Sequence, residues 1–351
     1  MGTILSIITF ILMLGILVFV HEFGHFITAK KSGVHIYEFA IGMGPLIKTI
    51  EGKDGIKYSI RALPIGGFVQ MAGEVYEDDE TKKIPKDKFL CNKPWYQRLI
   101  ILCAGVFNNF VLAIILLFFL ALTNDVARVV PVIDEVTKDT PAEKASLKPG
   151  DRIVEVEGTK ASSWDKVVLL LSLDEDKEKY DLVIERNGKE KEVTVKLEVK
   201  ENKDGTKSKV LGITMGNNGR GFTNSLRYAF EKFYATLDQM AYTVGGLFTG
   251  KVSINALSGP VGIFEVVDKQ RKQGISEIVF LTAYLSINLG LMNILPIPAL
   301  DGGHVLFVLI ELITRKKVNA KVEGIATTIF FFLLMALMLY VTIHDIIRMI
   351  L

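Results

Sequence analysis

Four long apolar segments constrain this 351-residue chain more than any other feature of its sequence. They run from residue 4 to about 26, from 99 to 122, from 278 to about 295, and from 325 to about 347. A helix of about 20 apolar residues crosses a hydrocarbon core of about 30 Å. Half of the residues are hydrophobic and the mean hydropathy is +0.35, both high for a soluble protein. The sequence therefore predicts a polytopic α-helical membrane protein with about four transmembrane helices.

Basic residues in short flanking segments predict its orientation. Lys30 and Lys31 follow the first segment, Lys93 precedes the second, and "RKKVNAK" at 315–321 separates the third from the fourth. Basic flanks of this kind stay on the cytosolic side. We therefore expect residues 124–276 to face outward. The net charge is +2 and no basic stripe carries interleaved aromatic residues, so nothing indicates binding to nucleic acid.

The first apolar segment contains the motif "HEFGH" at residues 21–25. On a helix, positions four apart lie on one face, so His21 and His25 can converge on one point. H-E-x-x-H on a helix is the zinc motif of metalloproteases, in which the glutamate, here Glu22, acts as general base. The alternative is a histidine pair bound to the glutamate at the membrane interface. Ionisable groups inside a span cost several kcal/mol and usually mark function, which favours the metal site.

A catalytic zinc needs a third protein ligand and an open coordination position. Asp301 lies in apolar sequence directly after a helix break at Pro296 and Pro298. Irregular backbone at membrane depth is tolerated where it is buried in protein or lines a polar cavity, so Asp301 is a candidate ligand. The alternative is that Asp301 caps the helix that follows. His304 is a weaker candidate ligand.

Residues 35–73 show the pattern of a β-hairpin, with a turn at "EGKDG" and alternating polar and apolar residues after it. Gly66 and Gly67 would let another backbone approach closely. Two interpretations remain open. The segment is an ordinary cytosolic hairpin, or it is a sheet edge beside the active site that pairs with an extended substrate segment.

The outward region begins with a domain of PDZ size at residues 124–216, which resembles the PDZ domains of bacterial periplasmic proteases. It contains a hairpin pattern that turns at Asn187-Gly188, a strong turn dipeptide. Residues 222–248 then show an apolar stripe at helical spacing together with several charged residues. This helix either lies on the membrane surface or packs against the PDZ-like domain.

The motifs "HEFGH" and "NILPIPALDGGH" resemble those of the site-2 protease family of intramembrane zinc metalloproteases, and most closely its bacterial RseP/RasP-like group. Four further stretches resemble that group in order and spacing: "PIGGFVQMAGE", "AGVFNNF", "GDRIVEVEG" and "LSGPVGI". The likeness covers nearly the whole chain, with one PDZ domain. It implies that Zn2+ is held by His21, His25 and Asp301, with Glu22 as the catalytic general base.

The resemblance also implies roles for two asparagines. Asn293 matches a family asparagine that helps to bind substrate or to stabilise the oxyanion, and a helix–helix hydrogen bond is the alternative. Asn109 matches a second family asparagine. Together with Gly66 and Gly67 these are the candidate substrate-binding residues. Val106 departs from the family, which has proline after Ala-Gly.

In function, the resemblance implies an intramembrane endopeptidase of the bacterial plasma membrane. Its partners would be the lipid bilayer and single-span membrane proteins, such as pre-trimmed anti-sigma factors or remnant signal peptides, with an upstream site-1 protease acting first. The PDZ-like domain would be extracytoplasmic and the active site would lie towards the cytoplasm. The alternatives are a catalytically inactive, membrane-anchored PDZ scaffold, and a metal transporter, for which the other spans carry too few polar residues.

The predicted fold therefore combines transmembrane helices, a membrane-associated β-hairpin or sheet, and one PDZ-like α+β domain. Its boundaries follow the apolar segments and the turns between them. In chain order they are the first helix 1–27, a β-rich loop 28–98, the second helix 99–123, the PDZ-like domain 124–216, an amphipathic surface-helix region 217–276, the third transmembrane segment 277–314, and a basic loop with the fourth helix 315–351.

Overall fold

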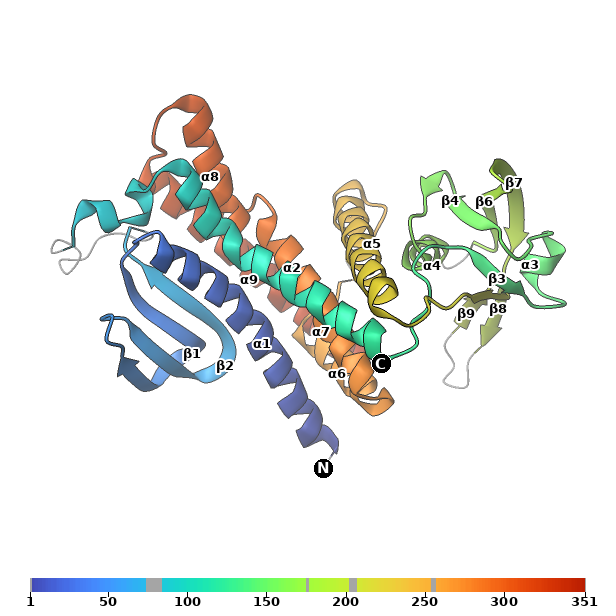
Figure 1. Cartoon of the computed structure of the whole chain (residues 1–351), viewed down its shortest axis with the longest axis horizontal. Helices are drawn as coiled ribbons and strands as arrows, with labels where there is room; N and C mark the ends of the chain where they lie inside the picture. The colour runs from blue at the N-terminus through green and yellow to red at the C-terminus, as the bar shows by residue number, and fades with distance from the viewer. Residues whose placement is uncertain (1, 74–83, 175–176, 202–206, 254–256, 351) are drawn as a thin grey trace. The chain divides into compact units, whose positions relative to one another are not determined.

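A computed structural model of the chain describes residues 2–73, 84–174, 177–201, 207–253 and 257–350. The chain divides into two compact units, shown with their elements in Figure 1. The first unit contains residues 1–113 and 257–351, and the second contains residues 114–256.

Four helices of the described chain are long and apolar enough to cross a membrane, which confirms the predicted number. They are α1 (Gly2–Lys31), α2 (Trp95–Thr123), α7 (Ile275–Ile294) and α9 (Ala320–Ile350). Large apolar side chains of α9 stay exposed, for example Phe332 at 66% and Leu339 at 62%. In water such a surface would be unfavourable, whereas in a bilayer it faces hydrocarbon.

The predicted hairpin is confirmed and is strongly curled. It consists of β1 (Ile36–Glu51) and β2 (Lys57–Met71), which pair antiparallel. Residues 36–41 pair with 67–71 on one side and with 57–60 on the other. The bends lie at Gly42 and Gly66, whose φ angles are 87° and 85°. Residues with a side chain rarely adopt such positive φ values. Because of this curl, residues 67–71 form an outer edge of the hairpin.

A small apolar core fixes the hairpin against α1. Phe26 and Ala29 of α1 pack with Ile36, Phe39 and Val69 of the hairpin. These α1 residues follow the "HEFGH" motif directly, so the core places the hairpin edge beside that motif. Two short 3-10 turns, Lys86–Lys88 and Leu90–Asn92, then lead into α2.

Helices α1 and α2 cross with their backbones almost in contact. A Cβ atom added at Gly24 would lie 2.3 Å from the carbonyl oxygen of Ala104, so only glycine fits there. The side-chain amide of Asn108 also donates a hydrogen bond to the carbonyl of Val20, at 3.2 Å. Small residues at such crossings let membrane helices approach closely. This crossing brings α2 against the turn of α1 that carries the histidines.

The predicted break between the third segment and Asp301 is confirmed. Helix α7 ends at Ile294 and α8 runs from Asp301 to Thr314 (Asp301–Thr314). A Cβ atom at Gly302 would lie 2.2 Å from the carbonyl oxygen of Ile294, and one at Gly303 would lie 2.3 Å from that of Ile297. The two glycines therefore let the intervening loop fold back onto the start of α8, which fixes the position of Asp301.

The "LSGPVGI" stretch leads into α6 (Pro260–Gln273), whose N-cap is Gly259. The backbone N–H groups of Gly259 and Gly262 donate to one carboxylate oxygen of Asp345 in α9, at 2.8 and 2.9 Å. A carboxylate at a helix N-terminus satisfies free donors and complements the helix dipole. The motif therefore joins α6 to α9 within the first unit.

The second unit is an α+β domain around an apolar core that includes Ile153, Trp164 and Tyr180. Its main sheet has the strand order β5-β4-β6-β7, and β10-β3 and β8-β9 are separate pairs. Asn187 and Gly188, with φ of 54° and 73°, form the predicted turn between β6 and β7. The elements are β3 (Ile133–Val136), α3 (Pro141–Lys144), β4 (Arg152–Val156), β5 (Thr159–Lys160), α4 (Trp164–Ser172), β6 (Lys179–Arg186), β7 (Lys189–Lys196), β8 (Glu198–Glu201), β9 (Lys207–Val210) and β10 (Ile213–Met215).

Helix α5 (Phe222–Thr249) packs against this domain with one face, as one of the two interpretations predicts. Lys232 pairs with Asp165 of α4 at 2.5 Å, and Phe233 is buried. Beside this face, large apolar side chains four residues apart stay exposed, with Phe222 at 67% and Tyr234 at 65%. One helix thus combines the packing interface with an apolar outer stripe.

An ion pair holds the start of β4. The guanidinium of Arg186 donates to both oxygens of Asp151 at 2.6 Å, and the backbone N–H of Lys148 donates to one of them at 2.8 Å. The Asp151 side chain is fully buried. Burial disfavours its charged form, but these donors outweigh burial and hold the pKa of the Asp151 carboxyl below its ordinary value.

We predict that Arg186→Met lowers the free energy of unfolding of this domain by about 3 kcal/mol at neutral pH, because it leaves a buried carboxylate without its partner. Folding lowers the pKa of the Asp151 carboxyl. The ion pair therefore stabilises the domain fully above the ordinary carboxyl pKa of about 3.9, and this contribution is lost as the pH falls through the pKa of the folded state. The difference between variant and wild type should therefore shrink in acid. Urea titration followed by the fluorescence of buried Trp164, in a Trp95→Phe background, measures it.

The matched control is Arg152→Met, which removes an arginine on the neighbouring strand whose pair with Glu185 is solvent-exposed. Exposed pairs contribute about 0–1 kcal/mol, so this variant should unfold nearly as the wild type does. Equal losses in the two variants at neutral pH would contradict a specific role for the Arg186–Asp151 pair.

Candidate metal centre and its cavity

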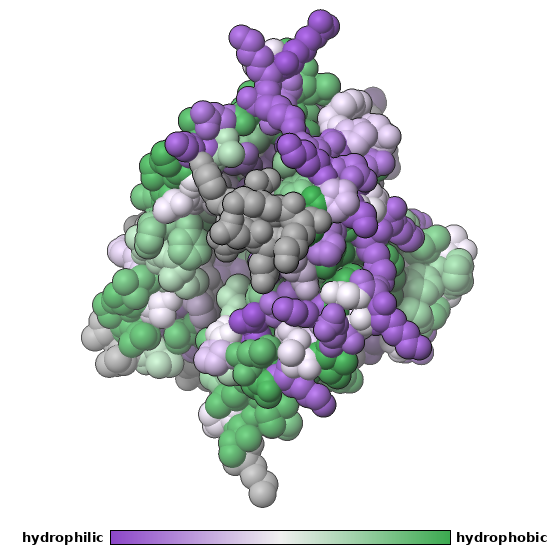
Figure 2. Space-filling view, turned by 90° about the vertical axis from the view of Figure 1, so that its left-hand side faces the viewer, coloured by the Kyte–Doolittle hydropathy of each residue, from purple (hydrophilic) through white to green (hydrophobic). Residues whose placement is uncertain are grey.

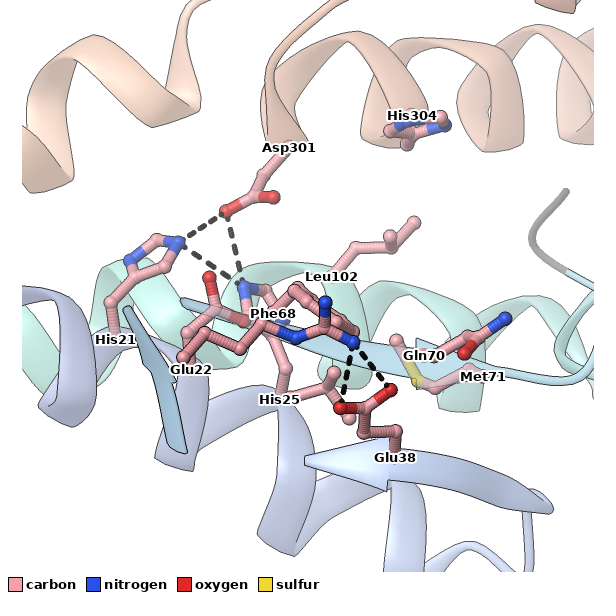
Figure 3. A pocket seen from close by; sticks show the side chains of 12 residues that line it. His21, Glu22, His25, Glu38, Phe68, Gln70, Met71, Leu102, Asp301 and His304 are labelled. Atoms are coloured by element: carbon pink, nitrogen blue, oxygen red, sulfur yellow. Dashed lines mark hydrogen bonds and ion pairs between the residues drawn. The ribbon is translucent and has the colours of Figure 1, made fainter. Parts of the chain in front are cut away.

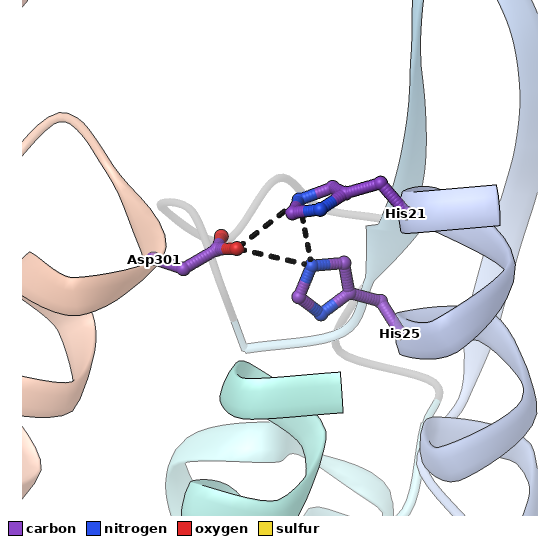
Figure 4. A group of neighbouring side chains, drawn as sticks. All are labelled: His21, His25 and Asp301. Atoms are coloured by element: carbon purple, nitrogen blue, oxygen red, sulfur yellow. Dashed lines mark hydrogen bonds and ion pairs between the residues drawn. The ribbon is translucent and has the colours of Figure 1, made fainter. Parts of the chain in front are cut away.

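Three side chains from two distant parts of the chain converge on one point. The Nε2 atoms of His21 and His25 lie 3.1 and 3.3 Å from Oδ2 of Asp301, and 3.3 Å from each other. Figure 4 shows the two rings on successive turns of α1 and the carboxylate approaching from the start of α8. Each histidine is 7% exposed. In the described part of the chain, this is the cluster whose ligand atoms could surround one metal ion.

Asp301 is not the cap of α8. Leu300 occupies the N-cap position, and Asp301 is the first residue of the helix with its side chain directed at the histidines. The alternative interpretation of Asp301 as a capping residue therefore does not describe its position.

The second ring nitrogen of each histidine is engaged by α2. His25 Nδ1 lies 2.8 Å from the carbonyl oxygen of Ile101, which can only accept, so Nδ1 carries the hydrogen and donates it. His21 Nδ1 lies 3.2 Å from the side-chain amide of Asn109, whose own oxygen is buried without a partner among the described residues. The structure places the amide nitrogen Nδ2 nearest the ring, and a 180° turn of the amide brings its partnerless oxygen there instead; we assign this turned orientation, in which Asn109 accepts from Nδ1–H. Both Nε2 atoms then keep a free electron pair.

This arrangement fits a zinc ion. With both Nδ1 atoms as donors, two Nε2 electron pairs and a carboxylate oxygen face one another, which is repulsive unless a metal ion or a proton on one Nε2 lies among them. Oδ2 of Asp301 is buried without a hydrogen-bond partner of good geometry among the described residues. Ligand atoms on a tetrahedral zinc with bonds of about 2.0–2.1 Å lie about 3.3 Å apart. The observed separations of 3.1–3.3 Å match this value.

The three side chains line a cavity of about 500 Å³, shown in Figure 3. Its wall contains an ion pair, in which Nη2 of Arg61 lies 3.0 and 3.1 Å from the two oxygens of Glu38. Phe68 and Leu102 add apolar surface. A cavity of this size and mixed polarity can hold both water and several residues of a peptide.

Glu22 lines the same cavity beside the metal cluster. The backbone N–H of Val69, on the outer edge of the hairpin in β2, is the backbone donor that faces this carboxylate. The hairpin edge therefore lies directly beside Glu22. The same edge, residues 68–71, contributes four residues to the cavity wall.

Gly66 and Gly67 act at this edge through close packing. A Cβ atom at Gly67 would lie 3.3 Å from Cγ of Glu22 and 2.9 Å from the carbonyl oxygen of Ala40. Gly66 forms the bend, where a Cβ atom would lie 2.9 Å from Met43. The glycines therefore let the hairpin edge reach the motif on α1, and neither is among the residues that line the cavity.

Asn293 and His304 lie outside the cluster. Asn293 is half-buried near the end of α7 and is not among the residues that line the cavity. His304 lines the cavity but stands apart from the metal cluster in Figure 3, and its Nδ1 lies 3.0 Å from Oε1 of Glu323. The structure therefore brings together His21, His25 and Asp301, and not His304.

Gly105 is a site residue that the motif analysis did not single out. A Cβ atom at this position of α2 would lie 2.3 Å from Nε2 of His25 and 2.7 Å from Cε1 of His21. The signal was present in "AGVFNNF", since a glycine inside an apolar helix marks a close approach. Its partner could not be identified from the sequence, because the crossing of α1 and α2 decides it.

We predict that Gly105→Ala abolishes stoichiometric zinc binding, because its methyl group would occupy the space of the ligand atom. Zinc per chain, measured by atomic absorption on purified protein, should fall to a small fraction of the wild-type value. Gly15→Ala is the control, since an added Cβ at Gly15 of α1 meets no atom within 4 Å. Equal zinc content in both variants, with wild-type circular dichroism, would contradict the proposed packing.

Comparison with known proteins bears on the class of the enzyme. The model of peptidase family M50 matches residues 9–337. A Fusobacterium nucleatum protein assigned as a zinc metalloprotease is 40% identical over 339 residues, which cover 93% of this chain and 96% of that protein. The zinc metalloprotease RasP of Geobacillus kaustophilus is 32% identical, with 98% of both chains covered. The regulator of sigma-W protease RasP of Bacillus subtilis is 31% identical, over 98% of this chain and 99% of that one.

A solved structure, the PDZ domain of the SdrC-like protein of Listeria monocytogenes, is similar to part of this chain. The match covers 26% of this chain and 90% of the Listeria chain, with 23% sequence identity and a TM-score of 0.21. A score this low establishes no fold, so the PDZ-like domain stays a prediction. The family match and the relatives cover nearly the whole chain. The chain belongs to peptidase family M50, the site-2 protease family, and is a zinc metalloprotease.

Proposed function

We propose that this protease hydrolyses peptide bonds within transmembrane segments of single-span membrane proteins, with zinc held by His21, His25 and Asp301. The observation that carries the proposal is the convergence of two Nε2 atoms and one carboxylate oxygen at 3.1–3.3 Å inside the first unit. The ligands lie on, or directly after, helices long enough to cross a membrane. A protease built in this way meets its substrate inside the bilayer.

Each residue of the site has a separate proposed role. Zinc, when bound, supplies a Lewis acid that polarises the scissile carbonyl and makes water acidic enough to react. Glu22 lines the same cavity and is the general base that takes the proton from the attacking water. Ile101 and Asn109 engage the Nδ1 atoms of the histidines and so orient both rings. Because Asn109 is fully buried, we assign it to His21 rather than to the substrate.

The hairpin edge is the proposed substrate-binding element. A transmembrane helix hides its peptide bonds in its own hydrogen bonds, so the substrate must become extended before it is cut. Residues 67–71 pair with β1 on one side only, and residues 68–71 line the cavity. An extended substrate can add to this edge as a further strand, which places its backbone beside Glu22. Asn293 is the candidate donor to the developing oxyanion.

We further propose that the active site lies towards the cytoplasm and that the PDZ-like domain lies outside a bacterial plasma membrane. The basic residues at 30–31, 93 and 315–317 support this orientation. The partners are then pre-trimmed single-span proteins, such as anti-sigma factors or remnant signal peptides, with a site-1 protease acting upstream. The Bacillus subtilis relative, named as a regulator of sigma-W, supports a substrate of the anti-sigma class.

Selection of substrates is assigned to the second unit. A hydrophobic site distinguishes poorly between substrate sequences, so control of access to the site is the more effective way to select substrates. The PDZ-like domain would exclude substrates with a bulky outer domain until another protease trims them. The exposed apolar stripe of α5, with Phe222 and Tyr234, supports contact with the membrane surface.

We predict that Glu22→Gln keeps stoichiometric zinc but lowers the rate of cleavage of a model single-span substrate by about 10²–10⁴-fold, because it removes a proton acceptor and not a ligand. Glu51→Gln, on the exposed part of the hairpin, is the control and should cleave normally. Near-normal cleavage by Glu22→Gln in detergent and in proteoliposomes would exclude Glu22 as the general base.

We also predict that Asp301→Ala loses both bound zinc and activity, whereas His304→Ala keeps its zinc. The two residues lie one turn apart on α8, so the pair is matched for local effects on the helix. Zinc content measured after dialysis against a weak chelator decides between them. If zinc stays in Asp301→Ala and leaves in His304→Ala, the third ligand has been assigned to the wrong residue.

A further inference from the structure

A second cavity, of about 360 Å³, lies apart from the metal centre in the first unit. Its walls come from the turn before α2, the first residues of α2, and the end of α8 with the loop that follows. Five of its lining residues are cationic and one is acidic: Lys93, Arg98, Arg315, Lys316 and Lys317 face Glu311. The protease mechanism uses none of these residues.

The single carboxylate does not neutralise the cavity. Glu311 forms an ion pair with Arg98, and its other oxygen accepts the backbone N–H of Val318 at 3.0 Å. In the described part of the chain no carboxylate pairs with Lys93, Arg315 or Lys316. Among the described residues the cavity therefore presents three cations without a carboxylate partner, and the one carboxylate in its wall, Glu311, is already paired with Arg98.

The walls of the cavity are fixed to one another. Nζ of Lys317 donates to the carbonyl oxygen of Cys91 at 3.1 Å and to Oδ1 of Asn92 at 3.0 Å. This lysine joins the loop after α8 to the turn before α2. The cations are thus arranged around a built hollow, which differs from basic residues scattered along a membrane surface.

The position of the cavity indicates which kind of anion it binds. Trp95, which begins the membrane helix α2, lines the cavity and is 50% exposed. Tryptophan at the end of a span lies at the level of lipid headgroups. Next to it, large apolar side chains stay exposed, with Ile100 at 56% and Leu312 at 46%. Figure 2 shows a band of hydrophilic side chains that begins at the top of this face, at the height of the α8–α9 loop in Figure 1, and continues down across its middle, with hydrophobic surface on either side.

We propose that this cavity binds the headgroup of an anionic phospholipid, with the phosphate among Lys93, Arg315 and Lys316 and the acyl chains along the exposed apolar side chains of α2 and α8. Charge complementarity at the membrane interface carries the assignment, since basic pockets beside membrane helices bind anionic headgroups. A free phosphate would use the cations and leave the apolar side chains without a partner. The proposal does not depend on the protease mechanism.

Trp95 gives a direct test, because Trp164 is the second of the chain's two tryptophans and lies in the other unit. In a Trp164→Phe background, the protein is placed in phosphatidylcholine nanodiscs that contain a small fraction of lipid brominated near the headgroup end of its acyl chains. Brominated phosphatidylglycerol should quench Trp95 several-fold more effectively than brominated phosphatidylcholine. Equal quenching by the two lipids would overturn the proposal.

The variant Lys93→Gln/Arg315→Gln/Lys316→Gln should lose this preference, because each removed charge weakens the binding of an anionic headgroup by roughly fivefold. The matched control, Lys48→Gln/Lys53→Gln/Lys57→Gln, removes three charges from the hairpin and should keep it. A preference that survives in the cavity variant, or falls equally in both, would contradict a specific site. Loss of the preference when millimolar inorganic phosphate is added at constant ionic strength would assign the cavity to free phosphate and would also overturn the proposal.

Discussion

The mutual approach of three electron-pair donors is the constraint on which the rest of the first unit depends. Two imidazole nitrogens and one carboxylate oxygen lie 3.1–3.3 Å apart in a buried place, which is unfavourable unless a metal ion or a proton lies among them. Contacts in the surrounding structure offset this unfavourable energy by fixing the position of each donor. Ile101 and Asn109 hold the two rings, and the folded-back loop before α8 holds the carboxylate. The metal centre is thus preorganised by helices and does not rest on a flexible loop.

Glycines make this preorganisation geometrically possible. At Gly24 the backbone of α1 meets that of α2, at Gly105 the two histidine rings lie against α2, and at Gly302 the loop meets the start of α8. At Gly67 the hairpin edge reaches Glu22. In a membrane, helices gain little from burying apolar surface against one another, so close packing and hydrogen bonds must fix their positions. Each of these glycines allows such a contact because it has no side chain, and the proposed catalytic groups lie where the contacts are made.

Features with a local cause were predictable from the sequence. Segment length and hydropathy predicted four membrane helices, turn chemistry predicted the hairpin and the Asn187-Gly188 turn, and helical spacing placed His21 beside His25. Asp301 could be identified as a candidate from the helix break before it. Its convergence with the histidines depends on tertiary packing, and before the structure it followed only from the family resemblance.

Other features could not be predicted, because they arise where separate elements meet. The curl of the hairpin follows from bends at Gly42 and Gly66, which turn residues 67–71 into an edge beside α1. The contact of Asn109 with His21 gives that residue a different proposed partner from the substrate that the resemblance implied. The basic cavity combines residues from 91–98 with residues from 308–317, and neither stretch alone indicates a hollow.

X-ray absorption at the zinc edge of the purified, active protein tests the central claim most directly. The account predicts a low-coordinate site with nitrogen and oxygen ligands at about 2.0–2.1 Å, and with outer-shell scattering from two imidazole rings. A sulfur ligand at about 2.3 Å would show that Cys103 or Cys91 binds the metal. Scattering from three imidazole rings would show that another histidine takes the place of Asp301. Either spectrum would contradict a centre built from His21, His25 and Asp301.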